Sequence, residues 1–250
     1  MPGPLLPRAP IDEVVFSFVL STPTGLDATE AGLYLAERTD RFPRHEVHEP
    51  IVNVNEPGWI EMPPPVRVWL VSADDGWLVQ LQRDRFLANW RKRGTAAYPG
   101  FTRSGGAMQF ALDEFSRFQA FCQRIHGGEK PVAATVDVSK IDLLVQGREW
   151  HEVAEALEIA PALKSAARWF SKPPTENIAI HTQEQIGPVT LVTSIAPARL
   201  RANPLMAAFR LEFRAVQPAG EDLAAQFTAI NAMLNDAFGR VIPDYAARFA

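Results

Sequence analysis

Apolar and polar residues alternate along several stretches of the chain, and these stretches predict strands. Residues 11–20, IDEVVFSFVL, predict the first strand, and residues 66–72 and the stretch from Trp77 predict a hairpin. The connection Asp74-Asp75-Gly76 supplies the residue with positive φ that a short hairpin turn needs. Further strands are predicted over residues 131–144, 177–186, 189–196 and 205–216.

The second arm of the hairpin is unusually long for one strand. It would run about 14 residues, roughly 45 Å at ~3.3 Å per residue, which exceeds the usual length of a strand. We therefore expect a bulge or bend near Arg83 to Arg85.

Apolar residues recur at helical spacing in other stretches. The strongest pattern runs from Met108 to Ile125 and ends at Gly127-Gly128. Asp27 and Glu30 have the spacing of a capping box at the start of a helix over residues 28–41. Helices are also predicted over residues 149–170, with a break at Pro161, and over residues 222–240.

The passage from Pro43 to Pro65 is rich in proline and in acidic residues. Because proline interrupts helices, we predict a long excursion over the surface that is functional or mobile.

The order of these elements predicts an α+β fold. Hairpins dominate and helices lie between groups of strands, so we expect a largely antiparallel curved sheet packed on long helices, with the last helix on the concave face. Helix-grip and saddle-like sheets are the architectures to compare. Residues 1–10 are predicted to be a flexible Pro-rich tail, and residues 11–145 and 146–250 two pseudo-similar halves of one compact unit.

Composition narrows the classes of function. The 250 residues are 47% hydrophobic, and a net charge of -4 argues against a globally basic nucleic-acid binder. The apolar runs are far shorter than the ~20 residues of a membrane-spanning helix, and the first residues lack the pattern of a signal peptide. Cys122 is the only cysteine, so no intramolecular disulfide forms, and we predict a cytoplasmic protein.

Polar residues interrupt the apolar pattern between Trp77 and Gly94. If that stretch were one continuous strand, Arg83, Arg85, Asn89 and Arg91 would share one face, and Gln82, Asp84 and Trp90 the other. Two interpretations stay open. The arginines form a polar recess that binds a carboxylate, a phosphate or an acidic segment of a partner, or they make internal ion pairs with acidic neighbours.

These same residues resemble a family of proteins. The run Gln82-Arg83-Asp84-Arg85-Phe86, then Asn89-Trp90-Arg91-Lys92 and Tyr98-Pro99, is similar to a sporadically distributed, uncharacterised family of bacterial and archaeal proteins of about the same length. The similarity is sharpest from Val66 to Phe101. The resemblance implies a shared fold and a shared purpose for the strand cluster, but no reaction. Gly100-Phe101-Thr102 stands where family members usually have a basic, an aromatic and an acidic residue.

Other candidate chemistries are weaker. His45, Glu46 and His48 lack the spacing of a helical zinc-protease motif, and Cys122 with His126 is half a metal site at most. Ser104-Gly105-Gly106 is either a turn or an anion site at a helix N-terminus. The sequence contains no nucleophile elbow, Walker loop or dinucleotide fingerprint. We therefore predict no catalytic residue, no metal and no cofactor.

Three functions are compatible with these features. The first is a non-enzymatic binding or accessory protein, of the antitoxin, immunity or gene-cluster partner type, which uses the strand cluster and the Pro-rich loop. The second is an enzyme or a binder of a small anionic ligand, with a cavity between the sheet and the last helix. The third is a binder of single-stranded nucleic acid through Arg91-Lys92-Arg93 and nearby rings. The candidate binding residues are Gln82, Arg83, Asp84, Arg85, Asn89, Trp90, Arg91 and Tyr98.

Overall fold

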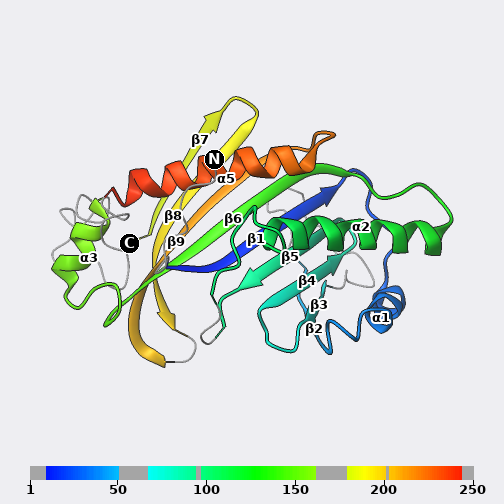
Figure 1. The fold of residues 1–250 in the computed structure, drawn as a ribbon, viewed down its shortest axis with the longest axis horizontal. Coiled ribbons are helices and arrows are strands. Elements are labelled where there is room, and N and C mark those ends of the chain that lie inside the picture. The colour runs from blue at the N-terminus through cyan, green and yellow to red at the C-terminus, as the bar shows by residue number, and fades with distance from the viewer. Residues whose placement is uncertain (1–9, 51–66, 94–96, 162–178, 201–202, 244–250) are drawn as a thin grey trace. The chain divides into compact units, whose positions relative to one another are not determined.

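The computed structural model describes residues 10–50, 67–93, 97–161, 179–200 and 203–243. The fold is α+β, as predicted, with an antiparallel sheet of nine strands and four helices among the described residues (Figure 1). The strands are hydrogen-bonded in the order β2-β3-β4-β5-β1-β6-β9-β8-β7. No helix in the described ranges is both long enough and apolar enough to span a membrane.

The chain forms two compact units. One consists of Val15–Asp137 and Pro218–Ala224 and is called here the β2–β5 unit. The other consists of Met1–Val14, Val138–Gln217 and Ala225–Ala250 and is called the β7–β9 unit. The division falls inside β1 (Ile11–Leu20) and β6 (Ala133–Val145), and the halves expected at 11–145 and 146–250 stay a prediction.

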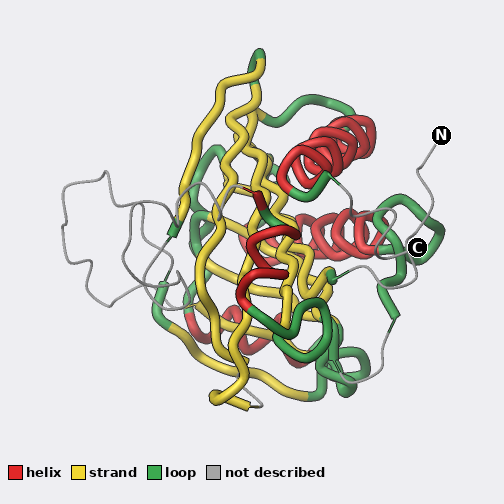
Figure 2. Tube along the Cα trace, turned by 90° about the vertical axis from the view of Figure 1, so that its left-hand side faces the viewer, coloured by secondary structure: helices red, strands yellow, loops and turns green. Residues whose placement is uncertain are grey.

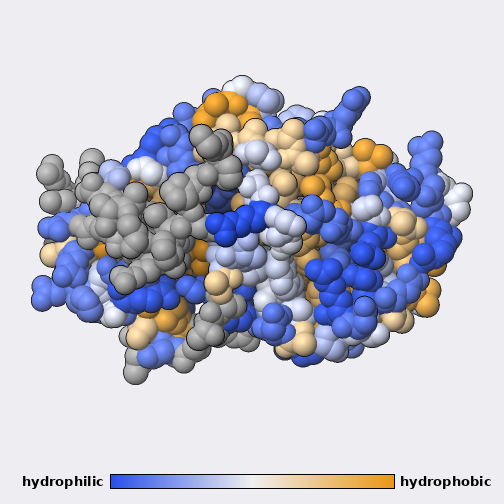
Figure 3. Space-filling view, viewed as in Figure 1, coloured by the Kyte–Doolittle hydropathy of each residue, from blue (hydrophilic) through white to orange (hydrophobic). Residues whose placement is uncertain are grey.

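The β2–β5 unit packs one face of its strands on helix α2. Its elements are α1 (Ala28–Ala36), β2 (Arg44–His48), β3 (Arg67–Val71), β4 (Trp77–Gln82), β5 (Arg85–Arg91) and α2 (Ala107–His126). The ring of Phe115 in α2 stacks on Phe18 with centroids 4.1 Å apart, and Phe118 lies 5.0 Å from Phe86. Mostly hydrophilic side chains cover the outer face of α2 (Figure 3). The helix ends at Gly127, whose φ of 65° confirms the predicted stop.

Helix α1 begins as predicted and ends early. Asp27 and Glu30 form the capping box. The helix stops at Ala36 rather than Arg41, because the following turns bring two arginines to a glutamate of α2. Glu114 is fully buried and lies 2.7 Å from Arg38 Nη2 and 3.1 Å from Arg41 Nη1.

The long second arm of the predicted hairpin is in fact two strands. A two-residue turn at Arg83 and Asp84 reverses the chain between β4 and β5. The interruption expected near Arg83 to Arg85 is therefore present, but it is a hairpin turn and not a bulge or bend within one strand. The carbonyl of Asp84 accepts a hydrogen bond from the backbone N–H of Leu20, and the carbonyl of Arg83 accepts one from Thr24. These bonds satisfy the backbone of the turn and hold it in place.

Part of the Pro-rich passage is also a strand. Residues 44–48 form β2, which pairs antiparallel with β3, so the excursion predicted from Pro43 is wrong for this part. Residues 51–65 of that passage lie outside the described residues.

The β7–β9 unit contains the second hairpin and the last helix. Its elements are α3 (Val153–Ile159), β7 (Ile180–Ile186), β8 (Val189–Leu200), β9 (Asn203–Pro218) and α5 (Leu223–Val241). Gly187 has a φ of 57° in the predicted turn between β7 and β8, which forms the tip at the top of Figures 1 and 2. Phe227, Ile230 and Leu234 of α5 are buried, as their spacing predicted. The helix predicted over 149–170 begins at Val153 rather than Glu149, and its predicted part over residues 162–170 lies outside the described ranges.

Candidate functional site

Strands β2 to β5 have one apolar and one polar face. The register places Gln82 opposite Arg85 and Leu78 opposite Asn89, and Trp69 of β3 lies beside Gln80. The face turned away from α2 is named here the polar face. Besides the apolar residues Val71, Leu78 and Leu87, it is formed by Arg44, Glu46, His48, Arg67, Trp69, Gln80, Gln82, Arg85, Asn89 and Arg91.

Hydrogen bonds cross the centre of the polar face from strand to strand. Arg67 donates to Gln80 Oε1 from Nε at 2.9 Å and from Nη2 at 2.5 Å, and Gln80 Nε2 donates to Asn89 Oδ1 at 2.9 Å. Both amides are 3% exposed. Burial lowers the pKa of Arg67, and the charge of Arg85 lowers it further. The guanidinium groups of Arg67 and Arg85 are therefore close enough to repel each other.

The turn at one end of the polar face carries an internal ion pair. Asp84 accepts hydrogen bonds from Gln82 Nε2 at 2.8 Å and from Arg85 Nη2 at 2.7 Å. Arg85 is buried, whereas the Asp84 side chain is about one-third exposed. Internal pairing, one of the two interpretations left open by the sequence, is thus observed for these two residues.

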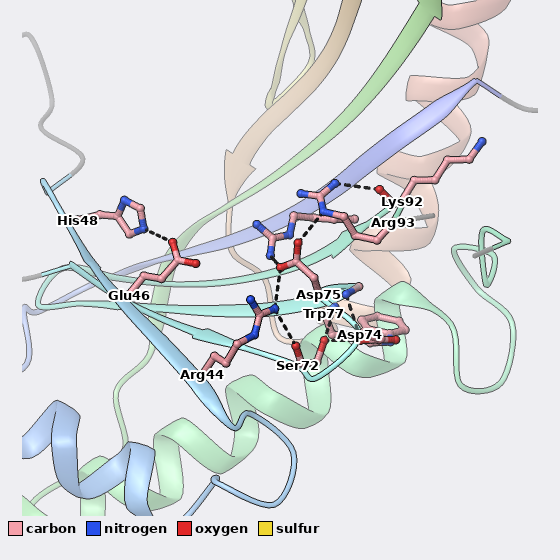
Figure 4. Close-up of polar contacts among 11 residues, drawn as sticks. Arg44, Glu46, His48, Ser72, Asp74, Asp75, Trp77, Lys92 and Arg93 are labelled. Carbon is pink, nitrogen blue, oxygen red and sulfur yellow. Dashed lines mark hydrogen bonds and ion pairs between the residues drawn. The ribbon is translucent and has the colours of Figure 1, made fainter. Parts of the chain in front are cut away.

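Three arginines converge on one carboxylate at the other end of the face. Arg93 Nε lies 2.8 Å from Asp75 Oδ2, Arg44 Nη2 lies 3.3 Å from Asp75 Oδ1, and Arg91 also pairs with Oδ1. We call Arg44, Arg91 and Arg93 the arginine cluster. Figure 4 shows Arg44 and Arg93 reaching Asp75 from different segments of the chain. Burial raises the pKa of Asp75, but the hydrogen bond from Arg93 and the three positive charges outweigh this effect and hold the pKa below its usual value.

The turn that carries Asp75 is fixed by its own hydrogen bonds. Ser72 Oγ donates to Asp74 Oδ1 at 2.6 Å and accepts from the N–H of Trp77 at 2.9 Å, and the N–H of Gly76 also donates to Asp74 Oδ1. The residue with positive φ is Asp75, at 58°, and not the glycine. Asp74 is therefore engaged within the turn, and Asp75 is presented to the arginines.

Aromatic rings lie beside the cations of the polar face. The ring of Trp69 stacks on His48 with centroids 3.9 Å apart. The guanidinium carbons of Arg67 and Arg91 lie 5.1 and 5.7 Å from the centroid of the same tryptophan. Such contacts hold guanidinium groups in position at little cost in hydration.

The structure brings together most of the predicted residues but not all of them. Gln82, Arg85, Asn89 and Arg91 lie on the polar face, and Arg83 and Asp84 form the turn. Gln82 shares a face with Arg85, contrary to the prediction, because the turn changes the alternation. Trp90 lies on the apolar face, where its ring is 5.0 Å from that of Tyr98. These two rings therefore do not belong to the polar face.

Several residues of the site were missed. They are Arg44, Arg67, Trp69, Asp75 and Gln80, and Arg93 was considered only for nucleic acid. The alternation Arg44-x-Glu46-x-His48 was the available signal for β2, but the flanking prolines favoured a loop.

The other candidate chemistries lie elsewhere. No group of three or more potential metal ligands is present among the residues that the structure describes. Burial raises the pKa of the Cys122 thiol to about 12, which disfavours the reactive thiolate. Gly106 caps α2, and its close approach to the carbonyl of Gly100 makes Ser104-Gly105-Gly106 a tight turn.

A second buried polar group was not predicted and lies in the β7–β9 unit. Lys140 of β6 donates from Nζ to Asn231 Oδ1 at 2.5 Å and to Asn235 Oδ1 at 2.6 Å, and the two asparagines are one turn apart on α5. Asp142, two residues along β6, is 5% exposed. This group joins the strand to the helix.

Comparisons with protein-family models, with curated proteins and with solved structures gave no match.

Proposed function

We propose that this protein is a non-enzymatic binding protein that recognises an acidic segment of a protein partner. The observation that carries the proposal is the convergence of Arg44, Arg91 and Arg93 on the single carboxylate of Asp75. The side chains of Arg44 and Arg93 are 51% and 37% exposed. Asp75 is the one acidic residue that the described part of the chain places within 4 Å of either guanidinium, so two partly exposed arginines share one carboxylate.

The chemistry of the cluster suits such a partner. Guanidinium groups form paired hydrogen bonds with carboxylates, and arginine is enriched among the residues that dominate binding energy at interfaces. The protein has a net charge of -4, so a cluster of arginines gives an acidic partner a local site of attraction against the overall negative charge.

A small anionic ligand is the second candidate. It is favoured by the repulsion between Arg67 and Arg85, since an anion near both groups would relieve it. This alternative includes an enzyme whose substrate is anionic.

The cellular location, the detailed architecture and the biological role of the protein are also proposals. A single cysteine supports a cytoplasmic protein, and the element order supports a helix-grip or saddle-like sheet with two similar halves. The resemblance to the sporadically distributed microbial family supports an accessory role of the antitoxin, immunity or gene-cluster partner type. The predicted contribution of the Pro-rich loop falls largely on residues 51–65, outside the described ranges.

Capture from the native host with matched variants tests the proposal. The baits are the wild-type protein, the double variant Arg44→Ser/Arg93→Ser, and the control Arg124→Ser. Arg124 is 55% exposed and pairs with one carboxylate, Glu37, so its removal changes the charge of the same unit without touching the arginine cluster. Circular dichroism verifies that each bait is folded.

We expect one stoichiometric protein partner with the wild type and with Arg124→Ser, and its loss with the double variant. Raising the salt concentration should release the partner, because exposed charges are screened within ~8 Å at physiological ionic strength. Equal capture by all three baits would contradict the proposal. Recovery of a clean monomer with a bound metabolite would favour the small-ligand alternative instead.

A further inference from the structure

Strand β7 ends the sheet with an exposed edge. It is the last strand in the hydrogen-bonding order, and β8 is the strand that pairs with it in the described part of the chain. The five residues from His181 to Gln185 are all exposed, so both faces of this arm of the hairpin are open to solvent. The edge can therefore accept a further strand.

The residues of β7 lack the features that usually keep an edge strand from pairing. The strand IHTQEQI contains no lysine, arginine or proline, and its register with β8 runs without a bulge from Ile180 to Ile186. At the other edge of the sheet, Arg44 and Glu46 place charges along the shorter strand β2. Since the exposed residues of β7 are polar rather than apolar, a specific contact is favoured over aggregation.

The turn of the hairpin determines which backbone groups of β7 face outward. Ile186 pairs with Val189 across the two-residue turn Gly187-Pro188, so this pair exchanges backbone hydrogen bonds. Alternate pairs of an antiparallel ladder are bonded in the same way, which directs the backbone groups of the even-numbered residues to β8. The N–H and C=O groups that point away from β8 therefore belong to His181, Gln183 and Gln185.

These outward groups match those of a second copy of the same strand. When two β7 strands pair antiparallel about a two-fold axis at Gln183, each Gln183 exchanges backbone hydrogen bonds with its counterpart, and His181 does so with Gln185 of the other copy. All three outward residues thus find a partner. Thr182 then lies opposite Glu184 of the other copy, so no two like charges face each other.

We propose that two copies of the protein pair through β7 in this register and form a two-fold dimer whose sheet continues from one chain to the other. The contact uses the same edge of both copies, so association stops at two chains. Each chain contributes one arginine cluster, and the dimer therefore carries two. The pairing does not depend on these arginines, and it adds an interaction surface beyond the proposed binding of an acidic segment.

Sedimentation of the full chain over micromolar to millimolar concentrations tests the dimer. We compare the wild type with Gln183→Pro and with the control Gln183→Thr. Proline removes an N–H that points away from β8, so the hairpin should stay folded, which circular dichroism verifies. We expect a monomer–dimer equilibrium for the wild type and, within about twofold in Kd, for Gln183→Thr, which keeps the N–H and suits a strand. Gln183→Pro should be a monomer.

Four charge variants test the register. An introduced charge at position 183 would face the same charge in the second copy, so Gln183→Lys and Gln183→Glu should both weaken the dimer. At position 182 the sign decides, because the introduced group faces Glu184, which is 53% exposed and lies 3.5 Å from Arg240. Thr182→Lys should tighten the dimer about fivefold and Thr182→Glu should weaken it about fivefold, since two symmetric pairs act together. An effect of net charge alone would instead make both lysine variants tighter.

Several results would overturn the dimer. They are a monomer at every concentration, a dimer that persists in folded Gln183→Pro, growth beyond two chains, or tightening by Gln183→Lys. A monomer that uses β7 to bind a strand of another protein would also overturn it. If Gln183→Pro fails to fold, the charge variants decide. Arg44→Ser/Arg93→Ser should dimerise like the wild type, so loss of the acidic partner and loss of the dimer are separate results.

Discussion

Replacement of Asp142 by asparagine should change how stability depends on pH. Burial raises the pKa of Asp142 to about 7, against a lowering by the charge of Lys140 and a smaller raising by that of Asp12. The same carboxyl in the unfolded chain has a pKa of about 4. Between these two values the native protein therefore holds one more proton than the unfolded chain.

The expected magnitude follows from this difference of one proton. A group whose pKa is raised by folding contributes stability that is fully present below the unfolded pKa and is lost as the pH rises through the folded pKa. The free energy of unfolding should fall by up to ~1.4 kcal/mol per pH unit, or about 2 kcal/mol from pH 5 to pH 6.5. Burial lowers the pKa of Lys140 to about 8, so this amine is protonated in both states over that window and adds no slope.

Urea unfolding at four pH values from 5 to 6.5 measures the effect. We compare the wild type, Asp142→Asn and the control Asp236→Asn, whose side chain is 74% exposed and pairs with Arg240. In Asp142→Asn the free energy of unfolding should fall less steeply with pH than in the wild type, because this carboxyl is absent. The control Asp236→Asn should have the same slope as the wild type. The absolute stability of Asp142→Asn does not matter for this test. Parallel plots of the free energy of unfolding against pH for Asp142→Asn and the wild type would refute the argument, because the carboxyl would then titrate alike in the folded and unfolded states.

Three further predictions use the β2–β5 unit. Arg85→Ala should lower the free energy of unfolding by about 1–3 kcal/mol in chemical denaturation, because Asp84 loses a buried partner while staying partly hydrated. An unchanged free energy of unfolding would show that the ion pair of Arg85 and Asp84 does not stabilise the fold. Gly106→Ala should lower the melting temperature by several degrees, since its Cβ would lie 2.5 Å from a backbone oxygen, whereas Gly128→Ala meets nothing within 4 Å and should not. The Cys122 thiol, with a pKa raised to about 12 by burial, should resist disulfide reagents at pH 8 until the protein is unfolded, and rapid labelling of the native protein would contradict this.

Local signals predicted the regular elements well. The first strand over residues 11–20, the capping box of Asp27 and Glu30, and the stop of α2 at Gly127 all have short-range physical causes that the sequence displays. These causes act within a few residues, so alternation and helical spacing are sufficient to locate such elements.

The turn at Arg83 and Asp84 could not be found in this way. Asp84 is a common turn residue, but neither residue is glycine and neither has positive φ, so the signal typical of a two-residue hairpin turn is missing. Its carbonyls are satisfied by Leu20 and Thr24, which lie about sixty residues earlier in the chain. Because this turn sets the alternation of β5, the error moved Gln82 to the wrong face.

The arginine cluster depends on contacts across the sheet. Arg44 meets Asp75 only because β2 pairs with β3, and the sequence separates the two residues by a proline-rich passage. The basic run at Arg91 to Arg93 was visible in the sequence, but the carboxylate that organises it looked like an ordinary turn residue. Pairing between distant segments therefore determined the site more than local composition did.

Buried Glu114 has a consequence for how the protein opens. Its carboxylate pairs with Arg38 and Arg41, which follow α1 in the chain. Detaching that segment would therefore leave a negative charge unpaired in the interior. Fraying of α1 is thereby coupled to the loosening of α2. Amide protons of the two helices should exchange with deuterium as one cooperative block rather than independently.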